Sequence, residues 1–166
     1  MTLRIRPARP DELDEAARVM LAAYQQYEAS FPTGRWERYA ADILDVRGRL
    51  PHAELIVAEE AGRIVGAVTL YPDGSRSGME GWPPEWAGVR LLAVHPDARG
   101  RGVGEALMRE CMERSRKRGV TTLGLHTTTV MAVARGMYER MGFVRAPEYD
   151  FHPAPGIVVM AYRMKL

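Results

Sequence analysis

Apolar residues recur along the chain with two different periods, and the change between the periods outlines the predicted elements. Apolar side chains at helical spacing, with charged residues between them, predict helices at residues 10–28, 36–50, 102–119 and 130–142. Apolar runs bounded by Gly and Pro predict strands at residues 3–5, 54–60, 63–71, 87–95, 121–128, 143–149 and 156–166. The chain therefore mixes helices and strands throughout its length.

The order of the elements is informative about the fold. Two of the strands, 54–60 and 63–71, are separated by only Ala-Gly, which predicts an antiparallel hairpin. Two strand–helix units follow, and the chain closes with two further strands. This order predicts one α+β domain over residues 1–166, with a mixed, mostly antiparallel sheet and about four helices packed on it.

Composition excludes several classes of protein. The chain has 166 residues, 46% hydrophobic and 27% charged, with a formal charge of +2. That charge is too small to predict a nucleic-acid partner. A single cysteine, Cys111, excludes an intrachain disulfide and fits a reducing compartment. No apolar leader and no stretch of roughly 20 apolar residues is present. We therefore expect a cytoplasmic protein with no membrane partner, and the histidine spacing predicts no metal site.

The stretch HPDARGRGVGEALM joins a predicted strand to a predicted helix. Gly100, Gly102 and Gly104 remove side chains from the backbone, while Arg99 and Arg101 add positive charge. A helix N-terminus there would present free N–H groups to an anion, so the pattern favours a diphosphate site. The spacing G-x-G-x-G differs from both the P-loop and the dinucleotide fingerprint. The alternative is an exposed turn that needs only flexibility.

These residues resemble a known family. LLAVHPDARGRGVGEAL is similar to the signature of the GNAT superfamily of acyl-CoA-dependent N-acyltransferases, with Arg99, Gly102 and Gly104 at its three set positions. ARGMYERMGF is similar to a second motif, A-x-x-x-Y-x-x-x-G-F, which places its tyrosine at Tyr138. The order of elements also matches that of the family, so the resemblance covers nearly the whole chain.

The resemblance implies a three-layer α/β/α fold whose central strands, here 87–95 and 121–128, splay apart to admit the pantetheine of acetyl-CoA. Met131 stands where many relatives carry an Asn that bonds the pantetheine, so it is only a possible contact. The coenzyme contacts implied in this way are Leu92, Ala93, Val94, Arg99, Gly100, Arg101, Gly102, Val103, Gly104, Glu105, Met131 and Tyr138.

The resemblance also implies roles in catalysis. The backbone N–H of Leu92 would polarise the thioester carbonyl as an oxyanion donor. Tyr138 would protonate the leaving thiolate, since a phenol pKa near 10 lies close to that of a thiol. The alternative for Tyr138 is a packing role on an amphipathic helix. No side chain resembles a nucleophile, because Cys111 lies on the apolar stripe of its helix, so we expect direct attack by the amine.

The sequence offers several candidates for the general base that deprotonates the acceptor amine. Some relatives carry it on the central strand, but the corresponding residues here are Gly88 and Arg90. Glu85, flanked by tryptophans in the preceding loop, is our candidate, because indole neighbours could desolvate its carboxylate. Glu80 in the same loop and His126 on the second central strand are alternatives, as is bulk water.

Aromatic residues in two loops predict an acceptor pocket. We expect it to include Tyr27, Trp36, Trp82 and Trp86. These side chains favour a small-molecule or amino-acid-like amine as the partner, since no acidic run suggests a peptide tail. The alternatives are a protein acetyltransferase and a catalytically weak acyl-CoA-binding module. Homodimers occur among relatives, so a homodimer is possible.

Overall fold

The computed structural model describes residues 2–78 and 82–166. The chain forms two compact units. The first combines the segment up to Leu70 with Leu91–Cys111, and the second combines Tyr71–Arg90 with Met112–Leu166. The prediction of one domain over residues 1–166 stays a prediction, and each unit is described by itself.

Three strands organise the first unit. β1 (Leu3–Pro7), β2 (Glu54–Glu60) and β3 (Arg63–Tyr71) are antiparallel neighbours in that order. The two-residue turn between β2 and β3 uses positive φ at Ala61 (52°) and Gly62 (77°). Such a turn matches the natural twist of paired strands, which explains the tight hairpin. The hairpin that the sequence predicts is therefore confirmed, with the predicted boundaries.

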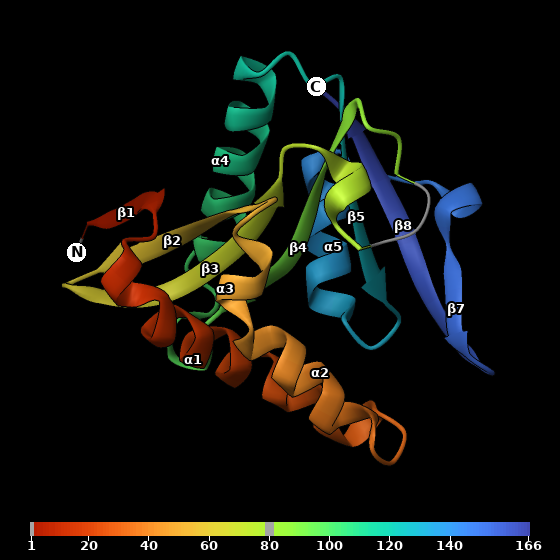
Figure 1. Cartoon of the computed structure of the whole chain (residues 1–166), viewed down its shortest axis with the longest axis horizontal. Helices are drawn as coiled ribbons and strands as arrows, with labels where there is room; N and C mark the ends of the chain where they lie inside the picture. The colour runs from red at the N-terminus through yellow and green to blue at the C-terminus, as the bar shows by residue number, and fades with distance from the viewer. Residues whose placement is uncertain (1, 79–81) are drawn as a thin grey trace. The chain divides into compact units, whose positions relative to one another are not determined.

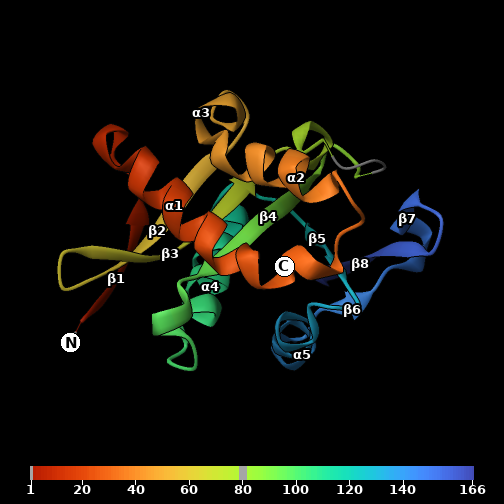
Figure 2. The same cartoon turned by 90° about the horizontal axis from the view of Figure 1, so that it is seen from below.

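Helices cover both faces of these strands. α1 (Leu13–Tyr24) and α4 (Val103–Lys117) lie on opposite sides of them in Figures 1 and 2. Gly66 on β3 lets α4 come close, because a Cβ there would lie 2.9 Å from the Val103 side chain. Cys111 on α4 is fully buried, in agreement with its predicted core position. The first unit thus has helix, sheet and helix layers.

The N-terminal helical segments are more broken than the sequence pattern predicts. The predicted helix 10–28 contains a 3₁₀ turn (Pro10–Glu12), then α1, then a further 3₁₀ segment (Gln25–Ser30). The predicted helix 36–50 is divided into α2 (Arg35–Leu44) and α3 (Val46–Arg49). Asp45 causes the break, since its ψ is 59° and its side chain accepts a hydrogen bond from the Gly48 N–H, which caps α3.

The second unit is built around a parallel pair of strands. In it, β4 (Trp86–Val94) pairs with β5 (Thr122–Thr128) over Trp86–Val89 and Thr122–Leu125. The other registered pairs are antiparallel, with β8 (Ile157–Lys165) beside β5 along its length. α5 (Ala132–Met141) packs on β5 and ends at Gly142, whose φ is 104°. β4 continues into the first unit from Leu91 onward.

One predicted strand is largely wrong. Residues 143–149 were expected to be extended, but β6 covers only Val144–Arg145 before a 3₁₀ turn at Pro147–Tyr149. Pro147 starts that turn because its fixed φ suits a helical first position. A further strand, β7 (Phe151–Ala154), pairs with β8 and was not predicted. The eight described strands nevertheless confirm the predicted α+β class with a mixed, mostly antiparallel sheet.

A buried ion-pair cluster fixes β1 against the start of α1. Arg6 Nη2 lies 2.6 Å from Glu12 Oε1 and 2.5 Å from Glu59 Oε1. Glu12 Oε2 also accepts a hydrogen bond of 2.7 Å from the Arg9 N–H. The bonds from Arg6 lower the pKa of the Glu12 carboxyl to about 2, against the opposing effect of burial. The ionised form of Glu12 is therefore favoured in the folded state.

Glu12→Gln is expected to lower the free energy of unfolding at pH 7 by about 2 kcal/mol, because it removes charge-assisted bonds between the buried Glu12 and the half-buried Arg6. A depressed folded-state pKa stabilises the fold above the unfolded value and loses that effect as pH falls toward about 2. Urea unfolding at pH 7 and pH 3 should show a smaller difference between wild type and variant at pH 3. Exposed Asp11→Asn serves as the control, and an equal difference at both pH values would contradict the assignment.

Candidate active site

The segment after β4 is shaped by two glycines. A 3₁₀ turn at Pro96–Ala98 follows the strand, and then Gly100 and Gly102 adopt φ values of 75° and 80°. Apart from the glycine itself and its two chain neighbours, no described residue has an atom within 4 Å of the position that a Cβ would take on either glycine. Backbone conformation, rather than crowding, is therefore what requires glycine here. Residues 99–102 are exposed, so the backbone of this loop faces open space.

The loop leads directly into the N-terminus of α4, a helix of 15 residues. The Ala106 N–H donates a hydrogen bond of 3.0 Å to the carbonyl of Gly102, the residue just before the helix. The N–H groups of Val103, Gly104 and Glu105 precede that bond. Together with the positive end of the helix dipole, they form a site suited to an anion.

Among the described residues, contacts within the first unit hold both loop arginines. Arg99 Nη2 donates to the carbonyl of Ala23 at 3.0 Å, and Arg101 Nη1 lies 2.9 Å from Glu60 Oε1. A guanidinium has five N–H donors, so one such contact orients the side chain and leaves other donors available. The structure thus brings the predicted residues 99–105 together around one loop and one helix end.

The first-unit part of β4 contains a feature that the sequence did not indicate. Leu91 has a φ of 56°, a left-handed conformation that is unusual for leucine. Next to it, the Leu92 carbonyl accepts a 2.9 Å hydrogen bond from the Tyr24 hydroxyl. A left-handed residue interrupts the regular alternation of a strand, as in a β-bulge. In a regular strand, side chains alternate between faces, so Gly88 and Leu92 would share one face. The left-handed Leu91 between them breaks that alternation.

In the second unit, the motif around Tyr138 forms a packed helix end. The Tyr138 side chain is buried, and its ring lies edge-on to that of Phe143 with centroids 5.8 Å apart. Its carbonyl accepts a hydrogen bond from the Phe143 N–H across the left-handed Gly142. This accounts for the packing part of the motif, while the proton-donor role of Tyr138 stays a prediction. Met131 is the N-cap residue of α5, and its coenzyme contact is likewise a prediction.

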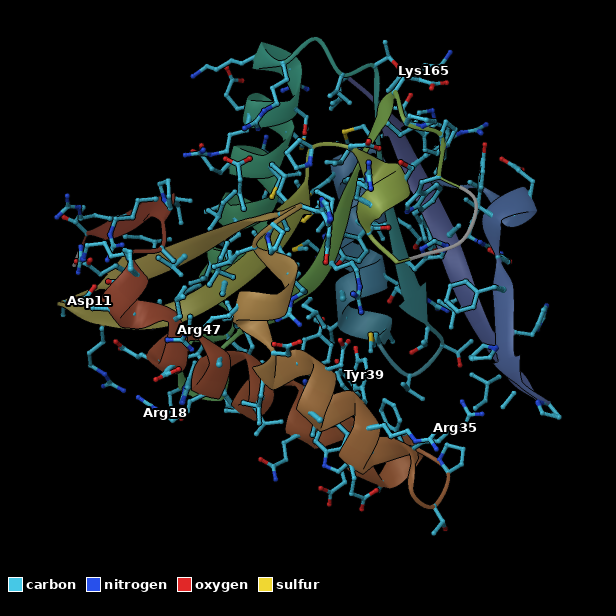
Figure 3. All side chains as sticks on the ribbon, in the orientation of Figure 1. Asp11, Arg18, Arg35, Tyr39, Arg47 and Lys165 are labelled. Atoms are coloured by element: carbon cyan, nitrogen blue, oxygen red, sulfur yellow. The ribbon has the colours of Figure 1, made fainter. Side chains whose placement is uncertain are left out.

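The predicted acceptor aromatics fall into two clusters. In the first unit, Phe31 stacks on Tyr39 at 5.0 Å and lies edge-on to Trp36 at 5.5 Å. Figure 3 labels Tyr39 on α2, one helical turn beyond Arg35. Tyr27 lies 6.1 Å from the buried Tyr24, and burial raises the pKa of Tyr27 while the charge of Arg99 opposes the shift.

The second cluster surrounds Trp82. Its ring centroid lies 5.1 Å from that of Trp86, 4.9 Å from that of Tyr149 and 4.6 Å from that of His126. Trp82 is only 4% exposed, and a Cβ on Gly124 would lie 2.9 Å from its ring. The indole therefore packs on the sheet over a glycine, beneath the half-buried Trp86. Any contact of Trp82 with an acceptor stays a prediction.

The candidate bases differ in their surroundings. Glu85 is exposed in the turn before β4, so the desolvation expected for it from its tryptophan neighbours is absent. Glu80 lies outside the described residues. His126 is half-buried, and its Nε2 lies 2.9 Å from the carbonyl oxygen of Tyr149. The sequence could not indicate this contact, because Tyr149 belongs to the turn that had been expected to be a strand.

The described residues form neither a metal-binding cluster nor a membrane-spanning helix. Among residues 2–78 and 82–166, no group of three or more His, Cys, Asp or Glu side chains is arranged to hold a metal ion. None of the helices described combines the length and apolar character needed to cross a membrane.

Comparison with known proteins adds independent information. The model of the acetyltransferase (GNAT) family matches residues 20–143. An uncharacterized N-acetyltransferase of Schizosaccharomyces pombe is 30% identical over 115 residues, which is 69% of this chain and 66% of that protein. A mycothiol acetyltransferase of Cellulomonas flavigena is 33% identical over 105 residues, 62% of this chain and 30% of that protein. The chain thus matches two thirds or less of the length of these relatives.

A similar structure is that of a GNAT family acetyltransferase from Brucella melitensis in complex with acetyl-CoA. It is 25% identical to this chain, with a TM-score of 0.65, and the match covers 86% of this chain and 83% of that one. The predicted resemblance in sequence is therefore matched by a resemblance in structure.

Proposed function

The chain belongs to the GNAT acetyltransferase family, and from that premise we propose that it is an acetyl-CoA-dependent N-acetyltransferase. Its acceptor in this proposal is the primary amine of a small or amino-acid-like molecule. The amine attacks the thioester directly, with both substrates bound. The single observation that carries the proposal is the loop at residues 99–105, where two left-handed glycines precede the N-terminus of a long helix.

The residues of that loop fit the diphosphate of a coenzyme. Anions favour a helix N-terminus, where free N–H groups and the helix dipole act together. A Cβ at Gly100 or Gly102 would both oppose the positive φ and occupy the open space on the loop. Arg99 and Arg101 supply charge-assisted donors at either side of the first glycine. In this proposal the segment Leu92–Val94 binds the pantetheine through its backbone.

The chemistry that acetyl-CoA supplies when bound is an acetyl group activated as a thioester. Toward it, the Leu92 N–H donates a hydrogen bond to the carbonyl oxygen and stabilises the negative charge that develops there. Tyr138 gives its hydroxyl proton to the departing thiolate sulfur. Met131 contacts the coenzyme arm through its thioether. The sequence-based candidate for taking the proton from the amine is Glu85.

The acceptor contact can be tested at the two half-buried tryptophans, Trp86 and Trp36. Trp86→Ala is expected to raise the KM for the acceptor about 10-fold, because a large apolar contact is lost. Trp36→Ala is expected to act similarly if the first aromatic cluster forms part of the pocket. Steady-state kinetics with the best acceptor would measure both, with the KM for acetyl-CoA as the internal control. Unchanged acceptor KM in both variants would contradict the predicted pocket of Tyr27, Trp36, Trp82 and Trp86.

The proposed activity is tested by following release of free thiol from acetyl-CoA in the presence of a panel of primary amines. The panel should contain benzylamine, tyramine, spermidine and glycinamide, together with a lysine-containing peptide. Faster release with small amines than with the peptide would support the proposal. Faster release with the peptide would favour a protein acetyltransferase, and coenzyme binding without release would favour a binding module.

A further inference from the structure

His126 is held in one defined orientation in the second unit. Its Nε2 lies 2.9 Å from the carbonyl oxygen of Tyr149. A carbonyl oxygen can only accept a hydrogen bond, so Nε2 must carry the hydrogen. In the neutral ring, the lone pair is then on Nδ1. The backbone of Tyr149 thus determines which nitrogen of His126 can take up a proton.

The Nδ1 atom of His126 is buried, and no described residue gives it a hydrogen bond. Buried polar atoms of this kind are uncommon, since each costs about 1–3 kcal/mol when it stays unsatisfied. The neighbouring rings are those of Trp82, at 4.6 Å between centroids, and Phe151, at 5.2 Å. Neither ring supplies a donor toward Nδ1 in the described contacts. The lone pair of Nδ1 therefore lies among aromatic rings without a hydrogen-bond donor from the described residues.

The position of His126 on β5 is defined by the pairing of β4 with β5. The parallel pairing of β4 with β5 ends at Val89 and Leu125, and His126 is the next residue of β5. Gly88 and Gly124 are register partners, so Arg90 and His126 lie two residues further on the same face. His126 thus stands one residue beyond the last register pair of the two parallel strands, on the same face as Arg90.

Burial, more than any charged neighbour, favours the neutral form of the imidazole. Burial lowers the pKa of His126, while the bond to the Tyr149 carbonyl and the charge of Asp150 act in the opposite direction. Arg90 on β4 adds to the lowering. The described rings against the imidazole, those of Trp82 and Phe151, are uncharged, as is its strand partner Ala161 on β8. The group therefore has the protonation state that a base needs at neutral pH.

Behind Tyr149, an ion pair holds the turn in place. Arg145 makes two bonds to Asp150, of 2.7 and 2.6 Å. Asp150 Oδ1 also accepts a 2.7 Å hydrogen bond from the Ala161 N–H on β8. These contacts anchor the turn that carries the Tyr149 carbonyl. Arg145 and Asp150 are thus positioning residues, because they hold the turn whose carbonyl orients His126, and Asp150 also acts on the imidazole through its charge.

We propose that His126 is the general base of the acetyl transfer, with Nδ1 as the atom that takes the proton from the acceptor amine. The proposal rests on the proposed function. The ammonium R–NH₃⁺ gives one proton to Nδ1 and becomes R–NH₂, whose lone pair forms the new C–N bond. As the C–S bond breaks, Tyr138 protonates the sulfur and recovers a proton from the former amine nitrogen. His126 then releases its proton to water, so amide, thiol and one proton are the products.

In this proposal, the amine reaches the buried Nδ1 by displacing the ring of Phe151. Phe151 lies edge-on to the imidazole and belongs to β7. The register of β7 with β8 consists of the pairs Phe151–Val159 and Ala154–Ile157, with an irregularity between them. The pairing of β7 with β8 is therefore irregular beside Phe151. The half-buried rings of Trp86 and Tyr149 flank the same cluster.

The test uses His126→Gln, whose amide N–H can still donate to the Tyr149 carbonyl but cannot act as a base. Thiol release from acetyl-CoA is measured from pH 6 to 9, with the amine panel and with water alone as the nucleophile. We expect release at pH 7 to fall about 100-fold, as for loss of a general base. The deficit should shrink at high pH, where more amine is already neutral. The Kd for acetyl-CoA should change by less than about twofold, since a coenzyme contact is not removed.

Two comparison variants and one spectroscopic measurement separate the outcomes. Exposed His52→Gln should leave thiol release unchanged. Loss of rate in Glu85→Gln with none in His126→Gln would overturn the proposal in favour of Glu85. Because His126→Gln could fail to fold, ¹⁵N NMR of the unaltered protein provides a second test, and Nδ1 protonated at pH 7 would also overturn it.

Failure of the proposed function has a different signature. If the unaltered protein does not bind acetyl-CoA, both the proposed function and the role of His126 are overturned. If the unaltered protein binds acetyl-CoA and His126→Gln releases thiol at the same rate as the unaltered protein, only the role of His126 is overturned.

Arg90→Met should raise the pKa of His126 in the same NMR titration, because a repelling positive charge is removed. An unchanged pKa would contradict the electrostatic part of the proposal.

Discussion

Tyr138→Phe is expected to lower kcat about 100-fold while changing the Kd for acetyl-CoA by less than about twofold, which is the pattern for loss of a general acid. The variant keeps the buried ring and its edge-on contact with Phe143, and it removes only the hydroxyl. Without that proton donor, the thiolate must leave unprotonated or take its proton from water. Steady-state kinetics and calorimetric coenzyme titration would measure the two quantities.

The matched control for this prediction is Tyr162→Phe. Tyr162 is also buried in the second unit, and its hydroxyl donates a 2.9 Å hydrogen bond to Glu139. Its loss should lower stability with little effect on kcat, because we assign Tyr162 no part in the reaction. Unchanged turnover in Tyr138→Phe, or an equal loss in both variants, would remove Tyr138 from the mechanism.

Gly102→Val should raise the Kd for acetyl-CoA about 100-fold, because two costs combine. A branched side chain in the left-handed region costs about 1–2 kcal/mol or more, so the loop would leave the φ of 80° seen here. The resulting movement would also displace the N–H groups at the start of α4 from the diphosphate, and each charge-assisted bond contributes about 1.5–3 kcal/mol. Isothermal calorimetry would measure the change directly.

Gly156→Val is the control for the conformational part of that effect. Gly156 also has a positive φ, of 79°, with no atom within 4 Å of a Cβ, and it lies in the turn between β7 and β8. Its substitution should lower stability by a similar amount and leave the Kd for acetyl-CoA unchanged. If Gly102→Val binds acetyl-CoA as tightly as wild type, the loop does not hold the diphosphate.

The sequence was most informative where local chemistry decides the structure. The Ala61-Gly62 turn and the glycines of the loop each follow from one short stretch, and the structure has both features. The motif around Arg99, Gly102 and Gly104 could be placed on a strand, a turn and a helix before the fold was known. These features need only the residues beside them, which is why sequence reasoning found them.

Features set by distant contacts were missed. Nothing in the sequence marks Leu91 as left-handed, since leucine has no intrinsic preference for that conformation. The turn at Pro147–Tyr149 replaced an expected strand because Arg145, Asp150 and the β8 backbone hold it in place. His126 could be recognised only as an alternative base, because its partner Tyr149 lies 23 residues away. The exposure of Glu85 likewise depends on the fold of the loop around it.

The most direct test of the account is a calorimetric titration of the purified protein with acetyl-CoA at moderate salt. The account predicts saturable binding with a Kd of about 1–100 µM, the range in which many enzymes hold their substrates. It also predicts that the affinity falls at higher salt, since an anion is bound by exposed arginines and backbone N–H groups. Absence of binding at about 1 mM acetyl-CoA, a free energy weaker than about −4 kcal/mol, would contradict the central claim.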